Sequence, residues 1–405
     1  MPIGNKKGNF VYPGYDPLEV PNSPTGISSS GETGGGYLDV SFTAPTNTGG
    51  ASISSYSVAT EDGVHTATGS SSPVRLTGLT DGTLYNFRVW ALNSYGPGPF
   101  GTGSGTPPAA IGLIQGGNIT SGRTATVDYI NIGASSGDST DFGDLTQATE
   151  NGGSGASETR ALFGGGSTGS NQNVISYTTF DTTGSYTDFG DLTTNREPAK
   201  GTGMSSSTRC VFGAGYQNNP TVGPTNTMDY VTIASTGNAI DFGDAVQPDY
   251  FCEFMWAAAS PTRGLSGGAS ATAQIGYITI ASTGNAVNFG DATAIESSTF
   301  YSGALSNNTR ACVNLGGTSS NVIYYVTIAT TGNATDFGDL TVSRGSCGTA
   351  STSTKGLWCG GYNTARSDVI DYVTITSTGN ATDFGDLVEA KNRGAGASNA
   401  HGGLS

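Results

Sequence analysis

Apolar and polar residues alternate along most of this chain with a period of two, which is typical of β-strands that bury one face. Segments of this kind lie at residues 38–42, 53–58 and 74–93, and Gly, Asp and Pro separate them. Beyond residue 109 the apolar stretches become shorter and more frequent, as at 310–315 and 322–328. The pattern predicts an all-β protein of many short strands joined by tight turns.

A four-residue sequence recurs six times in the second part of the chain. Its copies are Asp141-Phe142-Gly143-Asp144, Asp188-Phe189-Gly190-Asp191, Asp241-Phe242-Gly243-Asp244, Asn288-Phe289-Gly290-Asp291, Asp336-Phe337-Gly338-Asp339 and Asp383-Phe384-Gly385-Asp386. The phenylalanines are 47, 53, 47, 48 and 47 residues apart. A tyrosine lies 12 or 13 residues before each of them, at Tyr129, Tyr177, Tyr230, Tyr277, Tyr325 and Tyr372. This period indicates a solenoid or a propeller, in which each unit buries its apolar face only against its neighbours.

Each repeat holds four apolar stretches, and four short strands in about 47 residues are typical of one propeller blade. A parallel β-helix, the other candidate, usually has shorter coils. Residues 402–405 align with the start of a seventh copy and residues 111–114 with the start of the first. Both ends thus reach the same point of the cycle, and we predict a six-bladed β-propeller at residues 109–405.

The composition agrees with this fold and limits the partners. Gly accounts for 64 of 405 residues and charged residues for 12%, which suits turns and short strands better than helices. Gly-rich polar chains also form disordered segments, but here the aromatic and β-branched residues recur in phase with the repeat. The net charge of −15 repels nucleic acids and anionic membranes. We expect no nucleic-acid partner and, without an apolar run of about 18 residues, no membrane insertion.

The five cysteines are odd in number and lack paired spacing, so we expect buried thiols rather than a disulfide framework. They are Cys210, Cys252, Cys312, Cys347 and Cys359. Residues 1–10 contain no apolar segment of the kind found in secretory signals. We therefore expect assembly in a reducing cytoplasm, with release by lysis or as part of a particle.

The passage Leu76-Thr77-Gly78-Leu79, followed by residues 82–89, resembles the fibronectin type III family. The resemblance implies a β-sandwich at residues 22–107, in which Tyr85 is the corner tyrosine that bonds to nearby backbone. Phe42 stands where the family usually has Trp. Such modules are generally spacers and adhesion units, and no Arg-Gly-Asp sequence is present.

Residues 1–21 are rich in proline and predict an extended arm, because such a segment forms no core of its own. Its aromatic residues favour docking on a partner, with disorder as the alternative. The candidate anchor residues are Phe10, Tyr12 and Tyr15.

A glycine doublet, a tyrosine and then an aromatic residue with Leu follow one another in each repeat, and this order resembles the kelch repeat. The doublets are Gly116-Gly117, Gly165-Gly166, Gly267-Gly268, Gly316-Gly317 and Gly360-Gly361, with residues 213–215 as a degenerate copy. A later arginine also fits the kelch order, at Arg196, Arg344 and Arg393. Phe replaces the Trp of that family, so the resemblance implies a propeller fold and no particular activity.

The tempting chemical motifs have simpler explanations. Asp-Phe-Gly is the magnesium-binding sequence of protein kinases, but the other kinase motifs are absent. The repeated aspartates would suit calcium. We expect instead that each caps its turn or pairs with a basic residue about twenty positions later. Those basic residues are Arg160, Arg209, Arg263, Arg310 and Lys355.

Catalysis has little basis in this sequence. Only His65 and His401 are present, which disfavours a histidine-based triad or metal site. Two acids suffice for a glycosidase, but no repeat carries a distinctive extra pair. We expect no catalytic residue, no metal and no cofactor.

Residues 245–260 depart from the repeat and are rich in aromatic side chains. They form either an internal packing element or an exposed platform for sugar stacking or protein docking. The candidate binding surface consists of Tyr250, Phe251, Phe254 and Trp256.

The combination of an arm, a fibronectin-like module and tandem repeats resembles structural proteins of tailed bacteriophages. We expect a non-enzymatic virion protein, a fibre, spike or capsid or tail decoration, present in multiple copies. Its arm would bind other virion proteins, and its propeller a host-surface glycan or protein. The alternatives are a bacterial adhesin or lectin at the cell surface or outside the cell, and a glycan depolymerase.

Overall fold

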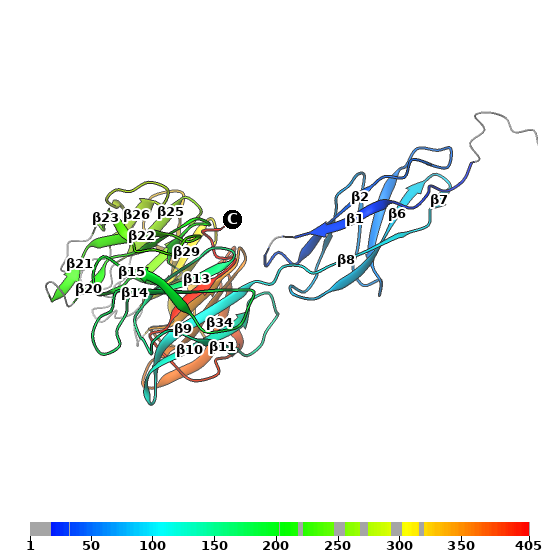
Figure 1. The fold of residues 1–405 in the computed structure, drawn as a ribbon. Helices are drawn as coiled ribbons and strands as arrows, with labels where there is room; N and C mark the ends of the chain where they lie inside the picture. The colour runs from blue at the N-terminus through cyan, green and yellow to red at the C-terminus, as the bar shows by residue number, and fades with distance from the viewer. Residues whose placement is uncertain are drawn as a thin grey trace, which may run out of the picture. The chain divides into compact units, whose positions relative to one another are not determined.

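The computed structural model describes residues 18–31, 33–201, 203–217, 222–246, 256–267, 274–292, 302–315 and 320–404. All regular elements in these residues are β-strands, so the predicted all-β class is confirmed. The chain divides into two compact units, Met1–Pro108 and Ala109–Ser405 (Figure 1).

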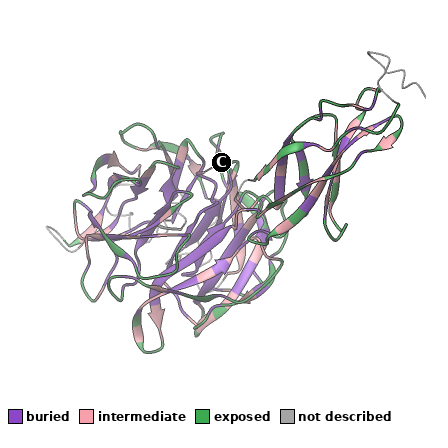
Figure 2. Cartoon of the chain, turned by 45° about the vertical axis from the view of Figure 1, so that its right-hand side comes forward, coloured by how far each residue is buried: buried purple, intermediate pink, exposed green. Residues whose placement is uncertain are grey.

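The first unit is a sandwich of two antiparallel sheets. One sheet has the order β1 (Thr25–Ser30), β2 (Tyr37–Thr43), β5 (Val74–Thr77). The other has the order β4 (Thr66–Gly69), β3 (Ser55–Thr60), β6 (Tyr85–Asn93), and both β7 (Gly96–Pro97) and β8 (Gly101–Gly105) pair with β6. Alternate residues of each central strand are buried, as the period of two predicts (Figure 2).

The core of this sandwich contains the two residues singled out in the sequence. The hydroxyl oxygen of Tyr85 accepts a hydrogen bond from the Thr80 N–H at 3.0 Å, which confirms the predicted corner tyrosine. Phe42 is buried, and its ring lies 4.7 Å from that of Tyr56. Phe42 thus packs in the core where the family usually has Trp.

Within the described residues, the second unit contains six antiparallel sheets, one for each sequence repeat, and each has four consecutively paired strands. We number these sheets repeats 1 to 6. Repeat 1 has β36 (Ala395–Ser398), β9 (Ile111–Ile119), β10 (Gly122–Asn131) and β11 (Thr140–Asp144). Repeat 2 has β12 (Gly153–Ala156), β13 (Arg160–Gly164), β14 (Val174–Thr179) and β15 (Thr187–Asp191). Repeat 3 has β18 (Met204–Ser205), β19 (Arg209–Phe212), β22 (Thr227–Thr232) and β23 (Ile240–Asp244).

The other three repeats follow the same order. Repeat 4 has β24 (Trp256–Ala259), β25 (Arg263–Gly267), β26 (Gln274–Thr279) and β27 (Val287–Asp291), and β17 (Lys200–Gly201) adds to β24 in parallel. Repeat 5 has β28 (Gly303–Ser306), β29 (Arg310–Asn314), β30 (Val322–Thr327) and β31 (Thr335–Asp339). Repeat 6 has β32 (Gly348–Ser351), β33 (Lys355–Tyr362), β34 (Arg366–Thr374) and β35 (Thr382–Asp386). A small additional sheet has the order β16 (Arg196–Pro198), β20 (Gly215–Gln217), β21 (Gly223–Thr225).

The first and last strands of the second unit meet in one sheet. β36, near the C-terminal end, pairs antiparallel with β9 and completes repeat 1. The closing strand is therefore residues 395–398, whereas the sequence alignment placed the seventh copy at 402–405. Residues 402–404 lie beyond this strand, and the Gly402 N–H donates to the Ser306 carbonyl of repeat 5 at 3.1 Å.

The first strand of each repeat is buried, and most of its residues are small; Met204, Trp256 and Leu305 are the larger ones. These strands contact one another in the cyclic order β36, β12, β18, β24, β28, β32 and back to β36. Hydroxyl groups link neighbours: Ser154 Oγ donates to the Gly396 carbonyl at 2.5 Å, and Thr349 Oγ1 to the Ala304 carbonyl at 2.6 Å. The many small side chains allow six strands to converge here.

The fourth strand of each repeat carries the Asp-Phe-Gly-Asp sequence. Its phenylalanine is buried, and in repeats 2 to 6 the ring stands edge-on to the repeat tyrosine at 5.6–6.1 Å. The glycine that follows has φ between 139° and 156° and lies at a register shift of the strand pair. These values favour glycine, so the sequence encodes a β-bulge.

The same strand binds the next repeat through its main chain. A glycine in the turn between the third and fourth strands of the next repeat donates its N–H to the phenylalanine carbonyl. The donor and acceptor pairs are Gly184–Phe142, Gly237–Phe189, Gly284–Phe242, Gly332–Phe289, Gly379–Phe337 and Gly137–Phe384, at 2.8–2.9 Å. The sixth pair joins repeat 6 to repeat 1, so the six bonds complete a cycle.

This contact predicts a sharp difference between two glycine substitutions. Gly338 has φ +145°, and a Cβ there would lie 2.3 Å from the Gly379 carbonyl oxygen of the next repeat. We expect Gly338→Ala to lower the free energy of unfolding by about 2–4 kcal/mol, through strain and overlap. Chemical denaturation measures the change.

Gly379→Ala is the matched control, because a Cβ at Gly379 meets nothing within 4 Å and the N–H that bonds to Phe337 is kept. We expect it to change stability by less than about 1 kcal/mol. Equal changes in the free energy of unfolding for the two substitutions would contradict the close contact between Gly338 and the Gly379 carbonyl.

Candidate functional site

Four arginines join neighbouring repeats at the start of the second strand. Each guanidinium lies over the tyrosine of its own repeat, 4.3–4.9 Å from the ring centroid. Each also donates to a main-chain carbonyl of the next repeat at 2.8–3.0 Å. The donor and acceptor pairs are Arg160–Ile233, Arg209–Ile280, Arg263–Ile328 and Arg310–Ile375.

Lys355 completes this set, since its Nζ donates to the Ile132 carbonyl at 3.2 Å and so joins repeat 6 to repeat 1. We call these five side chains the junction cations. Ile111 holds the corresponding position in repeat 1, where it belongs to the same apolar cluster as Phe180 of repeat 2. The sixth junction is therefore apolar.

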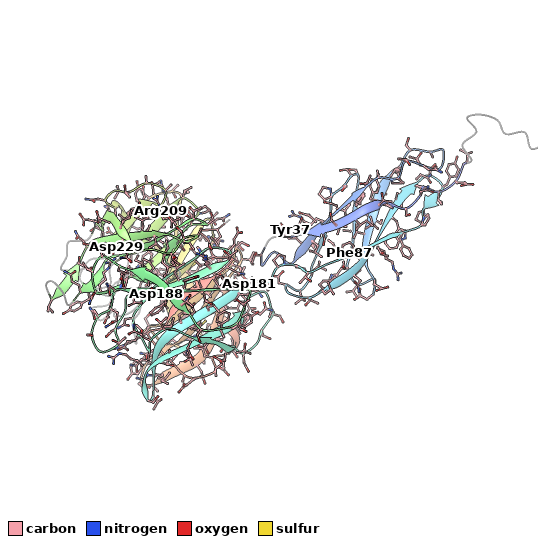
Figure 3. All side chains as sticks on the ribbon, in the orientation of Figure 1. Tyr37, Phe87, Asp181, Asp188, Arg209 and Asp229 are labelled. Atoms are coloured by element: carbon pink, nitrogen blue, oxygen red, sulfur yellow. The ribbon has the colours of Figure 1, made fainter. Side chains whose placement is uncertain are left out.

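The expected pairing of these cations with the repeated aspartates is not what the structure contains. The first residue of each copy, an aspartate in all but Asn288, is exposed, as Asp188 is, whereas Arg209 donates to the Ile280 carbonyl of the next repeat (both are labelled in Figure 3). None of the ion pairs among the described residues involves these aspartates. Turn capping does occur at Asp336, whose Oδ1 accepts the Gly338 N–H at 3.1 Å.

Three buried ion pairs form a second kind of link between repeats. Their donor and acceptor atoms are Arg196 Nη1 and Asp229 Oδ2 at 2.7 Å, Arg344 Nη2 and Asp371 Oδ2 at 3.0 Å, and Lys391 Nζ and Asp128 Oδ2 at 2.5 Å. All six side chains are at most 2% exposed. Each cation comes from the connection between repeats, and each aspartate directly precedes the tyrosine of the sheet that the cation enters (Figure 3 labels Asp229).

These pairs correct the arginine assigned from the kelch order. Arg196, Arg344 and Lys391 are each the seventh residue after the repeat phenylalanine. Lys391, not Arg393, therefore holds the equivalent position in the last copy. Arg393 instead contacts Glu150, with Nη1 3.1 Å from Oε2.

The residues after β36 cross the ends of the first strands. His401 is fully buried; its Nδ1 accepts the Gly403 N–H at 3.0 Å, and its Nε2 lies 3.0 Å from the Ala156 carbonyl oxygen. With Nδ1 accepting, Nε2 carries the proton and the ring is neutral. Burial lowers the pKa of His401 to about 4. Ser205 of β18 also contacts this ring, at 3.3 Å from Nε2.

A polar cluster lies at the opposite end of the sheets, around Glu150. Arg123 Nε is 3.2 Å from Glu150 Oε1, and Asn118 Nδ2 donates to Oε2 at 3.0 Å. Arg366 Nε donates to the Asn118 carbonyl at 3.0 Å, and its Nη2 donates to Asn118 Oδ1. With Arg393, these residues form what we call the Glu150 cluster. These residues were not identified as a group from the sequence.

The predicted binding surface is only partly described. Trp256 starts β24, is 1% exposed and belongs to the apolar cluster that also contains Leu265. It packs between sheets, so its indole offers no platform to a ligand, which corrects its assignment. Tyr250, Phe251 and Phe254 lie outside the described residues, as do the anchor candidates Phe10, Tyr12 and Tyr15.

The chemistry of the described side chains is limited. In that part of the chain, no three His, Cys, Asp or Glu residues gather as a metal ion would require. Cys210, Cys312, Cys347 and Cys359 are free and buried, and burial raises the pKa of Cys312 to about 12. Among the same residues no helix is long and apolar enough to cross a membrane.

The comparison with known families agrees with the first unit. The family model of the fibronectin type III domain matches residues 22–104, so this part of the chain is a fibronectin type III domain. No curated protein matches the chain at a significant level.

Removing one partner of a buried ion pair is expected to lower the stability of the folded chain strongly. Asp229→Ala leaves Arg196 buried without its carboxylate, and we expect a loss of about 3–5 kcal/mol of stability. The double variant Arg196→Met with Asp229→Ser removes both charges and is expected to lose less than the single one. Chemical denaturation of both variants measures this, and an equal or larger loss in the double variant would contradict the pair.

His401 predicts a pH dependence of stability. Its folded pKa is about 4 against 6.5 for the free side chain, so the unfolded chain binds a proton that the folded chain does not. The neutral His401 therefore contributes about 3 kcal/mol to the free energy of unfolding. This contribution is complete above pH 6.5 and is lost as the pH falls towards 4. An NMR titration of the imidazole, with His65→Gln for assignment, measures the folded pKa. A measured pKa near 6.5 would contradict the burial of the His401 side chain.

Proposed function

We propose that the six sheets of the second unit are the blades of a six-bladed, kelch-like β-propeller. Three observations support this: the cyclic contacts of the first strands, the six Gly–Phe main-chain bonds, and the pairing of β36 with β9. Three glycine doublets of the kelch-like order, at residues 116–117, 165–166 and 360–361, have positive φ between 59° and 115°. Glycine is favoured at these angles, which supports the resemblance at those positions.

We further propose that the protein is a non-enzymatic structural component of a tailed-phage particle that displays the propeller for adhesion. The observation that carries this proposal is that the polar groups shared between repeats serve to hold the repeats together. Most of the distinctive polar groups of the second unit, the junction cations and the buried ion pairs, join one repeat to the next. A chain whose charges stabilise closure in this way suits a rigid display scaffold.

The acidic surface and the fibronectin type III domain fit the same proposal. The domain at residues 22–104 acts as a spacer that carries the propeller. A net charge of −15 disfavours nucleic acid and anionic lipid as targets and leaves glycans or proteins of a host surface. The arm at residues 1–21 acts as the anchor to other virion proteins through Phe10, Tyr12 and Tyr15, and assembly takes place in the host cytoplasm.

The anchor proposal predicts the outcome of a precise truncation. A chain lacking residues 1–17 keeps Glu19, whose N–H bonds to the Gly49 carbonyl and whose carbonyl accepts from Asn93. We expect this chain to fold but to be missing from assembled particles. Mass spectrometry of purified particles, with the full chain as the control, measures incorporation. Undiminished incorporation of the truncated chain would contradict the anchor role of the arm. Absence of the full chain from particles would contradict the proposal that this is a virion protein.

A further inference from the structure

The basic residues of the second unit are few, and nearly all have a structural role. The sequence from residue 109 onward contains 12 of them. Five are the junction cations and three belong to the buried ion pairs. The side chain of Lys200 is not described. The other three, Arg123, Arg366 and Arg393, all lie in the Glu150 cluster.

Two long hairpins build this cluster. β9 and β10 have 9 and 10 residues, and β33 and β34 have 8 and 9, whereas in repeat 2, whose hairpin is also described throughout, β13 and β14 have 5 and 6. Arg123 follows the first hairpin turn and Arg366 the second. Arg393 comes from the connection that leads into β36. Three separate segments thus bring guanidinium groups to one place.

The cluster carries excess positive charge. The guanidinium groups of Arg123 and Arg393 contact the carboxylate of Glu150, which is only 6% exposed, and Arg366 is linked to it through Asn118. A second carboxylate, that of Glu197, lies next to the cluster, where it accepts a hydrogen bond from Asn151 Nδ2 at 2.9 Å. Even with Glu197 counted, cations outnumber anions in a chain whose net charge is −15.

The arginines also remain accessible. The side chain of Arg123 is 35% exposed and that of Arg393 is 33% exposed. Each guanidinium has five N–H donors in a planar fork that matches a carboxylate. The contacts with Glu150 and Asn118 orient these forks, and the exposed parts of the side chains face solvent.

We propose that the Glu150 cluster binds the carboxylate of an acidic sugar, such as a uronic acid, within a host-surface glycan. This inference rests on the proposed adhesion function and names its ligand class and its place on the propeller. One carboxylate of a bound sugar would balance the small net positive charge of the Glu150 cluster. A nucleic acid or another dense polyanion would meet the acidic surface beyond the cluster and be repelled.

The test uses the full chain on an array of carboxylate-bearing glycans, each beside its carboxyl-reduced, neutral counterpart. We expect binding to be confined to the acidic members. It should weaken several-fold between about 0.05 and 0.5 M salt, because screening shortens the range of charge interactions. The wild-type protein alone gives both results.

Arg123→Gln and Arg366→Gln are each expected to weaken binding about tenfold or more, since each removes a charge-assisted contact. Arg75→Gln is the matched control: it makes the same change of charge on the fibronectin type III domain, where Arg75 pairs with Asp39 at 2.8 Å. Unchanged circular dichroism and melting temperature show that each variant has folded.

The outcomes separate the two proposals. Binding of acidic glycans that survives both substitutions, or equal binding of the neutral counterparts, would overturn the carboxylate site and leave glycan adhesion standing. Binding to no glycan at all would overturn both the site and glycan adhesion. Loss of binding in the Arg75 variant as well would show a general charge effect and would also overturn the site.

Discussion

The main-chain bond between a turn glycine and the phenylalanine carbonyl of the preceding repeat is the constraint on which the second unit depends. It requires a β-bulge at the glycine after the phenylalanine, because that residue faces the next repeat with no room for a Cβ. It also requires the phenylalanine to be held in place, which its buried ring does against the repeat tyrosine. The Asp-Phe-Gly-Asp sequence therefore encodes an interface between repeats and not a catalytic motif.

The buried ion pairs follow a rule that the six junctions share. A cation seven residues after the phenylalanine occurs only where the next tyrosine is preceded by aspartate. In the other three copies the sequence has neither the cation nor the partner aspartate. The seventh residue after the phenylalanine is Thr149, Asp249 or Glu296, and the residue before the next tyrosine is Ser176, Gly276 or Tyr324, respectively. A buried pair is close to neutral in energy, but one buried charge alone costs several kcal/mol, about 3–5. Both partners must therefore appear or disappear together.

The strand content and the six repeats were predictable because period-two alternation and a recurring motif are local patterns that need no knowledge of distant contacts. The corner tyrosine followed instead from the resemblance of residues 76–89 to the fibronectin type III family. The partners of the junction cations were not predictable in this way. The pairing of Arg209 with the Ile280 carbonyl involves residues 71 positions apart, and it depends on how successive repeats pack. Nearness in sequence suggested an aspartate instead.

The Glu150 cluster was also missed because its residues are far apart in the sequence, and here the separation is even larger. Arg366 and Asn118 are 248 positions apart, and they meet only because β36 closes repeat 1 and places repeat 6 beside it. Arg393 and Glu150 are 243 positions apart and depend on the same closure. The cluster therefore spans the seam where the two ends of the repeat region join, through residues of repeats 6 and 1 and of the connections that flank repeat 1. A carboxylate bound there would contact residues from both sides of the seam, so ligand binding and the association of repeats 6 and 1 would stabilise each other.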